Sequence, residues 1–264
     1  SFEKAEIATD PREVDKLLTF VVIGAGPTGV EMAGQIRELA SHTLNKEFRS
    51  IDPKKARILL VDGAERPLPV FGEHLGDVMR RELESLGVEV ITGALVTALD
   101  HDCVELKFHD GTSKRIESEC KVWAAGVQAS ELGRVLAKRT GVELDRCGRV
   151  LVESDLTVPG HPEIFVLGDM MSVPGVPGVA QGAIQSARHA AATIIARLKG
   201  RKAPTAFSYR DKGSMATISR FKAVVKIGNF RLSGVSAWLA WCFLHLLYIV
   251  GFKSQLTTLV HWFF

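Results

Sequence analysis

The sequence predicts an α/β fold built on a doubly wound, mostly parallel sheet. The apolar run at residues 18–23 has no polar alternation, as expected for a parallel strand that is buried on both faces. A glycine-rich turn follows it, then a helical stretch at 30–43, a second apolar strand at 57–61 and a helix at 73–86. This order of strand, helix, strand and helix is typical of doubly wound sheets.

Composition and charge exclude several classes of protein. The chain has 264 residues, of which 46% are hydrophobic and 24% charged, so it can build one large globular domain or two smaller ones. The formal net charge of +3 gives no reason to expect nucleic acid as a partner. The four cysteines lie far apart and form no C-x-x-C pair. We therefore expect reduced thiols and no metal site.

The chain divides into four predicted segments. They are residues 1–17, 18–126, 127–232 and 233–264. The first reads as a helix that joins the first strand to something earlier, which suggests a fragment. Short strands follow residue 88, with a hairpin turn at His109-Asp-Gly111. In the third segment we expect helices at 128–139 and 179–198.

The turn after the first strand has the spacing of a dinucleotide-binding loop. Gly24-Ala-Gly-Pro-Thr-Gly29 follows a strand, opens a helix and precedes a second strand, which makes the G-x-G-x-x-G pattern specific. Gly24 permits the tight turn, Gly26 lets a pyrophosphate approach the backbone, and Gly29 allows close helix packing. Asp62 ends the second strand, where it can accept hydrogen bonds from ribose hydroxyls. Because a carboxylate repels a 2′-phosphate, the sequence predicts NADH rather than NADPH.

Several motifs, in order, resemble those of type II NADH dehydrogenases, the non-proton-pumping NADH:quinone oxidoreductases. The run from Gly24 to Glu31 resembles their NADH-domain signature, and the resemblance places Glu31 near the nicotinamide. Val122-Trp-Ala-Ala-Gly126 resembles the A-T-G sequence that closes the nucleotide domain of two-dinucleotide flavoproteins, with Ala125 at the threonine position. The resemblance assigns Ala125 and Gly126 to the NAD site.

The resemblance extends to a flavin motif and a quinone motif. Ile164-Phe-Val-Leu-Gly-Asp169 resembles the second flavin motif, whose aspartate binds the ribityl chain, so Gly168 and Asp169 are assigned to FAD. Ala180-Gln-Gly-Ala-Ile-Gln185 resembles the quinone-site motif; Ala180 is also assigned to the FAD site. Gln181 and Gln185 are four residues apart and share a helical face. Their amides can donate to quinone carbonyls without adding charge.

The resemblance implies a two-dinucleotide-binding-domain flavoprotein. Residues 18–126 would be its Rossmann-like NADH domain and 127–232 the returning half of its FAD domain, in a fragment that lacks the N-terminal FAD-binding βαβ unit. The implied function is electron transfer from NADH through FAD to a membrane quinone, in a homodimer and without proton pumping. Two alternatives stay open. One is a soluble pyridine-nucleotide disulfide reductase, and the other is a membrane-tethered NADH-binding module.

The last segment indicates contact with a membrane. The nineteen residues at 234–252 carry no formal charge, and by length alone this stretch could span a bilayer. One face carries a polar-tipped stripe of Trp238, Trp241, His245 and Tyr248. We therefore expect amphipathic helices that lie in the interface, with this stripe at the headgroups, on the cytoplasmic face of the cell membrane. The alternative is a helix buried in a dimer or domain core.

Overall fold

The computed structural model describes residues 1–204 and 206–263, with the backbone alone at residue 263. Thr205 and Phe264, which belong to the predicted segments 127–232 and 233–264, lie outside the described residues. The chain forms two compact units. The larger unit comprises residues 1–126 and 213–264, and the smaller unit comprises residues 127–212. Residues 213–232, predicted to belong with the segment before them, therefore pack in the larger unit instead.

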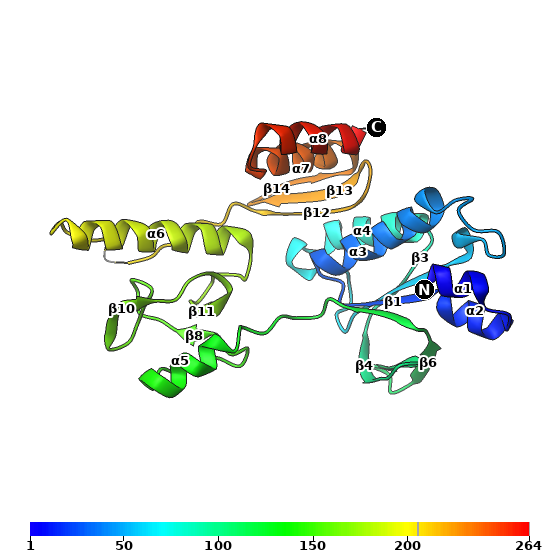
Figure 1. Ribbon diagram of the computed structural model, residues 1–264, viewed down its shortest axis with the longest axis horizontal. Helices are drawn as coiled ribbons and strands as arrows, with labels where there is room; N and C mark the ends of the chain where they lie inside the picture. Colours follow the sequence, from blue (N-terminus) through cyan, green and yellow to red (C-terminus); the bar gives the residue numbers. More distant parts are fainter. Residues whose placement is uncertain (205, 264) are drawn as a thin grey trace. The chain divides into compact units, whose positions relative to one another are not determined.

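A four-stranded parallel sheet lies at the centre of the larger unit (Figure 1). Its strands, in spatial order, are β3 (Val88–Ile91), β2 (Arg57–Val61), β1 (Thr19–Ile23) and β7 (Cys120–Trp123). Helices α3 (Pro27–Glu38) and α4 (Glu73–Ser85) pack with this sheet. The strand order reverses direction between β1 and β7, which is where a doubly wound sheet binds ligands at its carboxyl edge. The predicted α/β class is confirmed.

Two of the predicted helices are interrupted. The first is a pair, α1 (Phe2–Ile7) and α2 (Pro11–Leu17), because Pro11 starts a new helix and the Asp10 carboxylate caps it by accepting from Arg12 N–H at 2.9 Å. The second ends earlier than predicted, since α3 passes at residue 39 into a π-helical turn, Leu39–Thr43. Short 3₁₀ turns follow. They are Pro53–Lys55 and Pro69–Phe71.

A three-stranded antiparallel sheet covers one face of the parallel sheet. It consists of β4 (Ala94–Leu99), β5 (Cys103–Phe108) and β6 (Ser113–Glu117). The predicted hairpin turn between β5 and β6 is confirmed, and Gly111 there has a φ of +87°. Side chains of both sheets share one apolar core. Its buried members are Val21, Ile23, Leu59, Val61, Ala94, Val104, Leu106 and Ile116.

The other face of the parallel sheet carries α3 and α4, and beyond them a C-terminal layer (Figure 1). This layer is an antiparallel sheet of β12 (Ser214–Ser219), β13 (Lys222–Ile227) and β14 (Phe230–Ser233), with the helices α7 (Gly234–Tyr248) and α8 (Phe252–Phe263) on it. At Gly34 the backbones of α3 and β12 meet, because a Cβ there would lie 2.1 Å from the Ile218 carbonyl oxygen.

Over its described residues, 127–204 and 206–212, the smaller unit contains two α-helices and four short strands. These elements are α5 (Leu132–Thr140), β8 (Val150–Leu151), β9 (Thr157–Val158), β10 (His161–Phe165), a 3₁₀ turn (Gly168–Met170), β11 (Met171–Ser172) and α6 (Ala180–Leu198). The predicted helix at 128–139 begins four residues later, after a backbone hydrogen bond that ties Ala129 to Cys147. All four cysteines are free thiols; Cys103 and Cys242 are buried.

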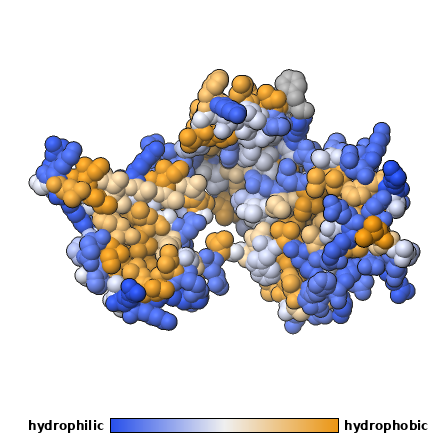
Figure 2. Space-filling model, in the orientation of Figure 1, coloured by the Kyte–Doolittle hydropathy of each residue, from blue (hydrophilic) through white to orange (hydrophobic). Residues whose placement is uncertain are grey.

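The prediction for the aromatic stripe is partly wrong. Trp238 is only 4% exposed and packs on Phe221, with ring centroids 4.8 Å apart, so it cannot anchor at headgroups. The helix also ends at Tyr248, and a second helix follows. The apolar side chains of α7 and α8 that face outward form an apolar surface, which Figure 2 shows. Among the residues described, no helix combines the length and the apolar character needed to cross a bilayer.

We expect Gly34→Ala to lower the melting temperature. The added methyl group would overlap the Ile218 carbonyl and force β12 away from α3, and overpacking of this kind costs about 1–3 kcal/mol. Thermal unfolding followed by circular dichroism measures the change. The exposed neighbour Gln35→Ala is the control and should leave the melting temperature unaltered. An unchanged value for Gly34→Ala would contradict the close packing of α3 and β12.

Candidate functional site

The glycine loop after β1 is held by two backbone contacts. Gly24 has a φ of +102°, and its N–H donates to the Val61 carbonyl at 2.7 Å. A Cβ at Gly24 would lie 2.7 Å from the backbone nitrogen of Ala125, so the loop after β7 lies directly against this glycine. Only glycine combines this φ with such close contact. Gly24 therefore brings the carboxyl ends of β1, β2 and β7 together.

The other two glycines of the loop have different surroundings. A Cβ at Gly29 would lie 1.7 Å from the Gly24 carbonyl oxygen, which confirms that close helix packing requires glycine there. At Gly26, by contrast, no atom lies within 4 Å of where a Cβ would be. Gly26 is also the N-cap of α3, and no side chain caps this helix. The first N–H groups of α3 and the open space at Gly26 therefore suit a pyrophosphate.

Asp62 directly follows β2 and faces the glycine loop. Its half-buried carboxylate accepts hydrogen bonds from the backbone N–H of Ala25 and from that of Ala64, the latter at 2.7 Å. A carboxylate has about four acceptor positions, so two are left for other donors such as ribose hydroxyls. The structure thus adds a role that the sequence did not reveal, because Asp62 also fixes the glycine loop.

The loop after β7 is locked by an aromatic side chain. Trp123 is 60% exposed, and its indole N–H donates to the Ala125 carbonyl at 2.8 Å. This bond holds the backbone that packs on Gly24. Ala125 and Gly126 are exposed, and Gly126 has a φ of +78°. Sequence reasoning assigned Ala125 and Gly126 but missed Trp123, whose only signal was an aromatic residue at the end of a strand.

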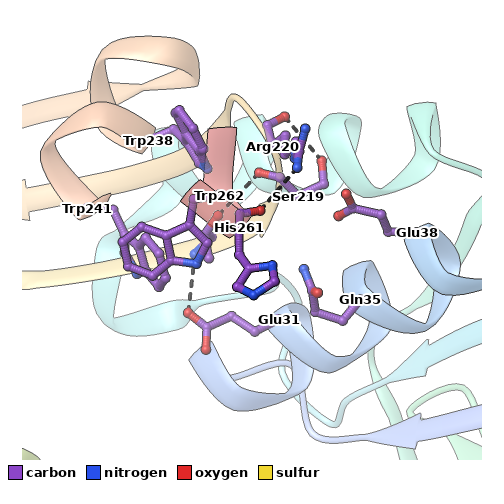
Figure 3. Close-up of a pocket in the computed structure, with 10 residues that line it drawn as sticks. Glu31, Gln35, Glu38, Ser219, Arg220, Trp238, Trp241, His261 and Trp262 are labelled. Atoms are coloured by element: carbon purple, nitrogen blue, oxygen red, sulfur yellow. Dashed lines mark hydrogen bonds between the residues drawn. The ribbon is translucent and has the colours of Figure 1, made fainter. Parts of the chain in front are cut away.

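Glu31 contacts the C-terminal layer. Its carboxylate accepts from Thr217 N–H of β12 at 3.2 Å. Burial raises the pKa of Glu31, while the Thr217 hydrogen bond and the nearby His245 oppose this shift. Glu31 lines a cavity of about 370 Å³ between α3, β12, α7 and α8 (Figure 3). The lining residues are Glu31, Gln35, Glu38, Thr217, Ser219, Arg220, Trp238, Trp241, His261 and Trp262. The sequence did not predict this contact with β12.

In the smaller unit, the predicted flavin motif begins at the end of β10 and ends in the 3₁₀ turn Gly168–Met170. Gly168 has a φ of +60°, and its N–H donates to the Ser186 hydroxyl of α6 at 3.1 Å. A Cβ at Gly178 would lie 3.5 Å from an Asp169 carboxylate oxygen, so Asp169 lies near the segment that leads into α6. Asp169 is exposed, as is Ala180 at the start of α6.

The two predicted quinone-site glutamines meet on one face of α6. Gln185 Nε2 donates to Gln181 Oε1 at 3.4 Å. Gln185 also donates to the Arg210 carbonyl at 3.0 Å and accepts from Arg210 N–H at 3.0 Å. The prediction that the two glutamines share a helical face is confirmed, and the hydrogen bond between their amides is a finding of the structure. The contact with Arg210 was not expected from the sequence, since 25 residues separate the partners.

The structure collects the predicted residues other than Glu31 in two places, while Glu31 lies in the cavity between α3 and the C-terminal layer. The carboxyl edge of the parallel sheet holds Gly24, Gly26, Gly29, Asp62, Ala125 and Gly126. The N-terminal half of α6 and the turn beside it hold Gly168, Asp169, Ala180, Gln181 and Gln185. A glycine loop, an uncapped helix and a strand-end carboxylate on a parallel sheet define a dinucleotide-binding domain.

Comparison with known proteins places the chain in a family. Residues 2–193 match the family described as pyridine nucleotide-disulphide oxidoreductase, and the chain belongs to it. Within the curated proteins, the chain is 57% identical to the type II NADH:quinone oxidoreductase Ndh of Mycobacterium tuberculosis over 264 residues, and 53% identical to NdhA of the same organism over 266. Each alignment covers 99% of this chain but 57% of the relative, so the chain spans little more than half their length.

A solved structure supports the fold. The chain resembles NDH2 from Plasmodium falciparum in complex with NADH, with a TM-score of 0.87 and 17% identity. The match covers 98% of this chain and 68% of the other. At this identity the likeness establishes the fold alone, and it confirms the predicted α/β architecture.

We expect Asp62→Asn to narrow the preference for NADH over NADPH. Removing the charge removes repulsion of the 2′-phosphate, and losing one acceptor beside Ala25 also weakens the loop, so the affinity for NADH should fall as well. Calorimetric titration of the chain with each nucleotide measures the ratio of its affinities for NADH and NADPH. Asp77→Asn, on α4, is the control and should leave the ratio unchanged. Equal affinity of the unaltered chain for the two nucleotides would contradict the assignment of Asp62.

Proposed function

We propose that this chain takes part in electron transfer from NADH through FAD to a membrane quinone, without proton pumping. The observation that carries the proposal is the 53–57% identity, over 99% of the chain, to type II NADH:quinone oxidoreductases. The geometry of the glycine loop agrees with it.

The residues of the larger unit fit NADH. The open space at Gly26 and the uncapped start of α3 suit the pyrophosphate, and Asp62 retains acceptor positions for ribose hydroxyls. Glu31 lies one helical turn further along α3, and the resemblance to the family assigns it to the nicotinamide end of the dinucleotide. The loop of Ala125 and Gly126, held by Trp123, would line the opposite side.

The smaller unit contains groups that fit the sugar-like part of FAD. Asp169 is exposed and can accept hydrogen bonds from the ribityl hydroxyls, while the turn at Gly168 keeps the backbone open beside it. The N-terminus of α6, capped by no side chain, starts at Ala180 and adds positive potential close to this carboxylate. Bound flavin would supply the chemistry, accepting hydride from NADH and passing two electrons to quinone.

The glutamines of α6 would bind the quinone. Gln181 and Gln185 present neutral amides, which can donate to carbonyl oxygens in a mostly apolar site. The rival disulfide reductase would need a redox cysteine pair, and the four cysteines of this chain form none with one another. The rival NADH-binding module would bind the nucleotide but reduce no quinone. An assay that compares NADH-dependent reduction of a short-chain quinone with that of a disulfide substrate separates the three functions. The quinone oxidoreductase reduces the quinone, the disulfide reductase reduces the disulfide, and the binding module reduces neither.

We expect Gln181→Ala, in the flavin-loaded enzyme, to slow quinone reduction while flavin reduction by NADH stays nearly unchanged. Gln185→Ala should also slow the quinone step, because both glutamines belong to one hydrogen-bonded pair. Stopped-flow absorbance of the flavin resolves the two half-reactions. If flavin reduction collapses in these variants, the residues serve the nicotinamide side or the fold, and the proposed quinone site is wrong.

We further propose that α7 and α8 attach the protein to the cytoplasmic face of the cell membrane without crossing it. The two helices and the turn between them carry apolar side chains that are about half or more exposed. These are Val235, Leu239, Phe243, Leu247, Val250, Phe252, Leu256 and Val260. The exposed cations Arg231 and Lys253 flank α7 and would attract anionic lipids, each by roughly 1 kcal/mol.

We expect the double variant Phe243→Ser, Leu247→Ser to bind vesicles at least about tenfold more weakly, because burial of each apolar side chain contributes roughly 1.5–3 kcal/mol. Co-sedimentation with anionic vesicles measures binding. Val70→Ser removes an equally exposed apolar side chain elsewhere in the larger unit and should change nothing. Full retention by the double variant, or protection of the C-terminus from protease inside sealed vesicles, would refute the interfacial arrangement. The homodimer stays a prediction, tested by the mass of the solubilised protein.

A further inference from the structure

The cavity beneath α7 and α8 carries opposite charges on different walls. Its volume of about 370 Å³ is in the range of sites for small ligands. Glu31 and Glu38 line it from α3, and Arg220 lines it from the turn between β12 and β13. Among the residues that the structure describes, none of these three groups belongs to an ion pair. The cavity therefore presents a cation and two carboxylates that do not neutralise one another.

The turn that carries Arg220 is held in place by two contacts with the C-terminal helices. Its second residue, Phe221, has a φ of +66°, which a bulky side chain rarely adopts, and its ring packs on the buried Trp238 of α7. Arg220 Nη2 donates to the backbone carbonyl of His261 in α8 at 3.3 Å. A guanidinium has several N–H donors, so others remain for an anionic ligand. Arg220 is thus a positioned cation at the edge of the cavity.

Two tryptophans form a corner of the same cavity. The rings of Trp241 in α7 and Trp262 in α8 have centroids 5.1 Å apart and planes inclined by 51°. Trp241 also stacks on His245, with centroids 4.1 Å apart, which fixes its ring. Figure 3 shows these indoles and the acidic side chains of α3 on different sides of the cavity. Because indole faces attract ammonium groups, this corner suits the cationic end of a ligand.

The helices that cover the cavity are the ones proposed to meet the bilayer. Phe243 and Leu247 of α7 are 66% and 62% exposed on the outward side, whereas Trp238 of the same helix is buried. A helix that lies in the membrane interface is sunk only about 5–10 Å into the boundary between headgroups and acyl chains. Lipid headgroups would therefore lie beside α7 and α8, at the level of the cavity.

We propose that this cavity binds the headgroup of a phospholipid that carries an ammonium group, as phosphatidylethanolamine does. The phosphate binds Arg220 through charge-assisted hydrogen bonds, and the ammonium group lies in the corner of Trp241 and Trp262. A headgroup with a phosphate but no ammonium would leave this corner without a cation, and the α3 carboxylates would repel it. The proposal rests on the proposed attachment of α7 and α8 to a bilayer and names the lipid that this attachment selects.

The first test compares two soluble lipids that share a phosphate and the same short acyl chains. They are dihexanoyl phosphatidylethanolamine and dihexanoyl phosphatidylglycerol, each below its micelle concentration. Calorimetric titration of the chain measures both affinities. We expect the ethanolamine lipid to bind roughly fivefold more tightly, as expected for one contact between a cation and an indole. Equal affinities for the two lipids would overturn the proposal.

The two ends of the headgroup are separated by two variants. Arg220→Gln should weaken the binding of both lipids roughly tenfold, because both lose the charge on the phosphate, whereas Arg220→Lys should retain most of the affinity. Arg81→Gln, which removes an exposed arginine of α4, is the control and should change neither affinity. Unaltered binding by Arg220→Gln would contradict the phosphate site.

Trp262→Leu keeps an apolar side chain but removes the indole face. We expect it to abolish the preference for the ethanolamine lipid while the affinity for the glycerol lipid stays nearly the same. Trp123→Leu removes an exposed indole at the end of β7 and should leave the preference intact. A preference that survives in Trp262→Leu would refute the ammonium site.

Co-sedimentation with vesicles distinguishes this proposal from the membrane attachment on which it rests. Vesicles of mixed phosphatidylethanolamine and phosphatidylglycerol should retain more of the chain than vesicles of phosphatidylglycerol alone, and Trp262→Leu should lose the difference. If both kinds of vesicle retain the unaltered chain equally, the attachment stands and the headgroup site is overturned. If neither retains it, the attachment is refuted, and with it the bilayer as the source of the headgroup.

Discussion

The larger unit depends on the close approach of backbone segments at positions without a side chain. At Gly24 and Gly29 a single methyl group would overlap the backbone of the loop after β7 or of the glycine loop itself. Because these atoms are in contact, the ends of β1, β2 and β7 meet the start of α3 at one point. Asp62 then bonds Ala25 across this junction, so the group expected to bind ribose also fixes the loop expected to bind phosphate.

The same kind of contact joins the C-terminal layer to the nucleotide domain. Gly34, two turns along α3 from the glycine loop, lets the carbonyl of Ile218 lie against the helix. This brings Thr217 N–H within reach of Glu31 and creates a half-buried carboxylate whose pKa is raised by burial. Helix α3 therefore begins at the proposed dinucleotide site and packs along one side against the layer of β12, α7 and α8, the last two of which are proposed to meet the membrane.

The local pattern of residues along the sequence was enough to predict the glycine loop after the first strand and most of the helices and strands. Two buried strands, the glycine spacing and the hairpin turn before Thr112 are determined by short-range rules, namely strand hydrophobicity and permitted φ values. Gly24, Gly26, Gly29 and Asp62 could be selected by the same local rules. Glu31 and the candidates from Ala125 to Gln185 were assigned by the resemblance of their motifs to a known family. Helix ends were less accurate, because Pro11 and the contact of Ala129 with Cys147 act against the apolar periodicity.

Contacts between residues distant in sequence were not predictable. The sequence alone determined the parallel sheet, the dinucleotide loop and the apolar character of the C-terminal helices. Only the tertiary structure decided that residues 213–232 pack on α3, that Trp238 faces inward, and that Gln185 binds the backbone of Arg210. The physical reason is that a helical periodicity shows which residues share a face, whereas the partner of that face depends on the packing of the whole chain.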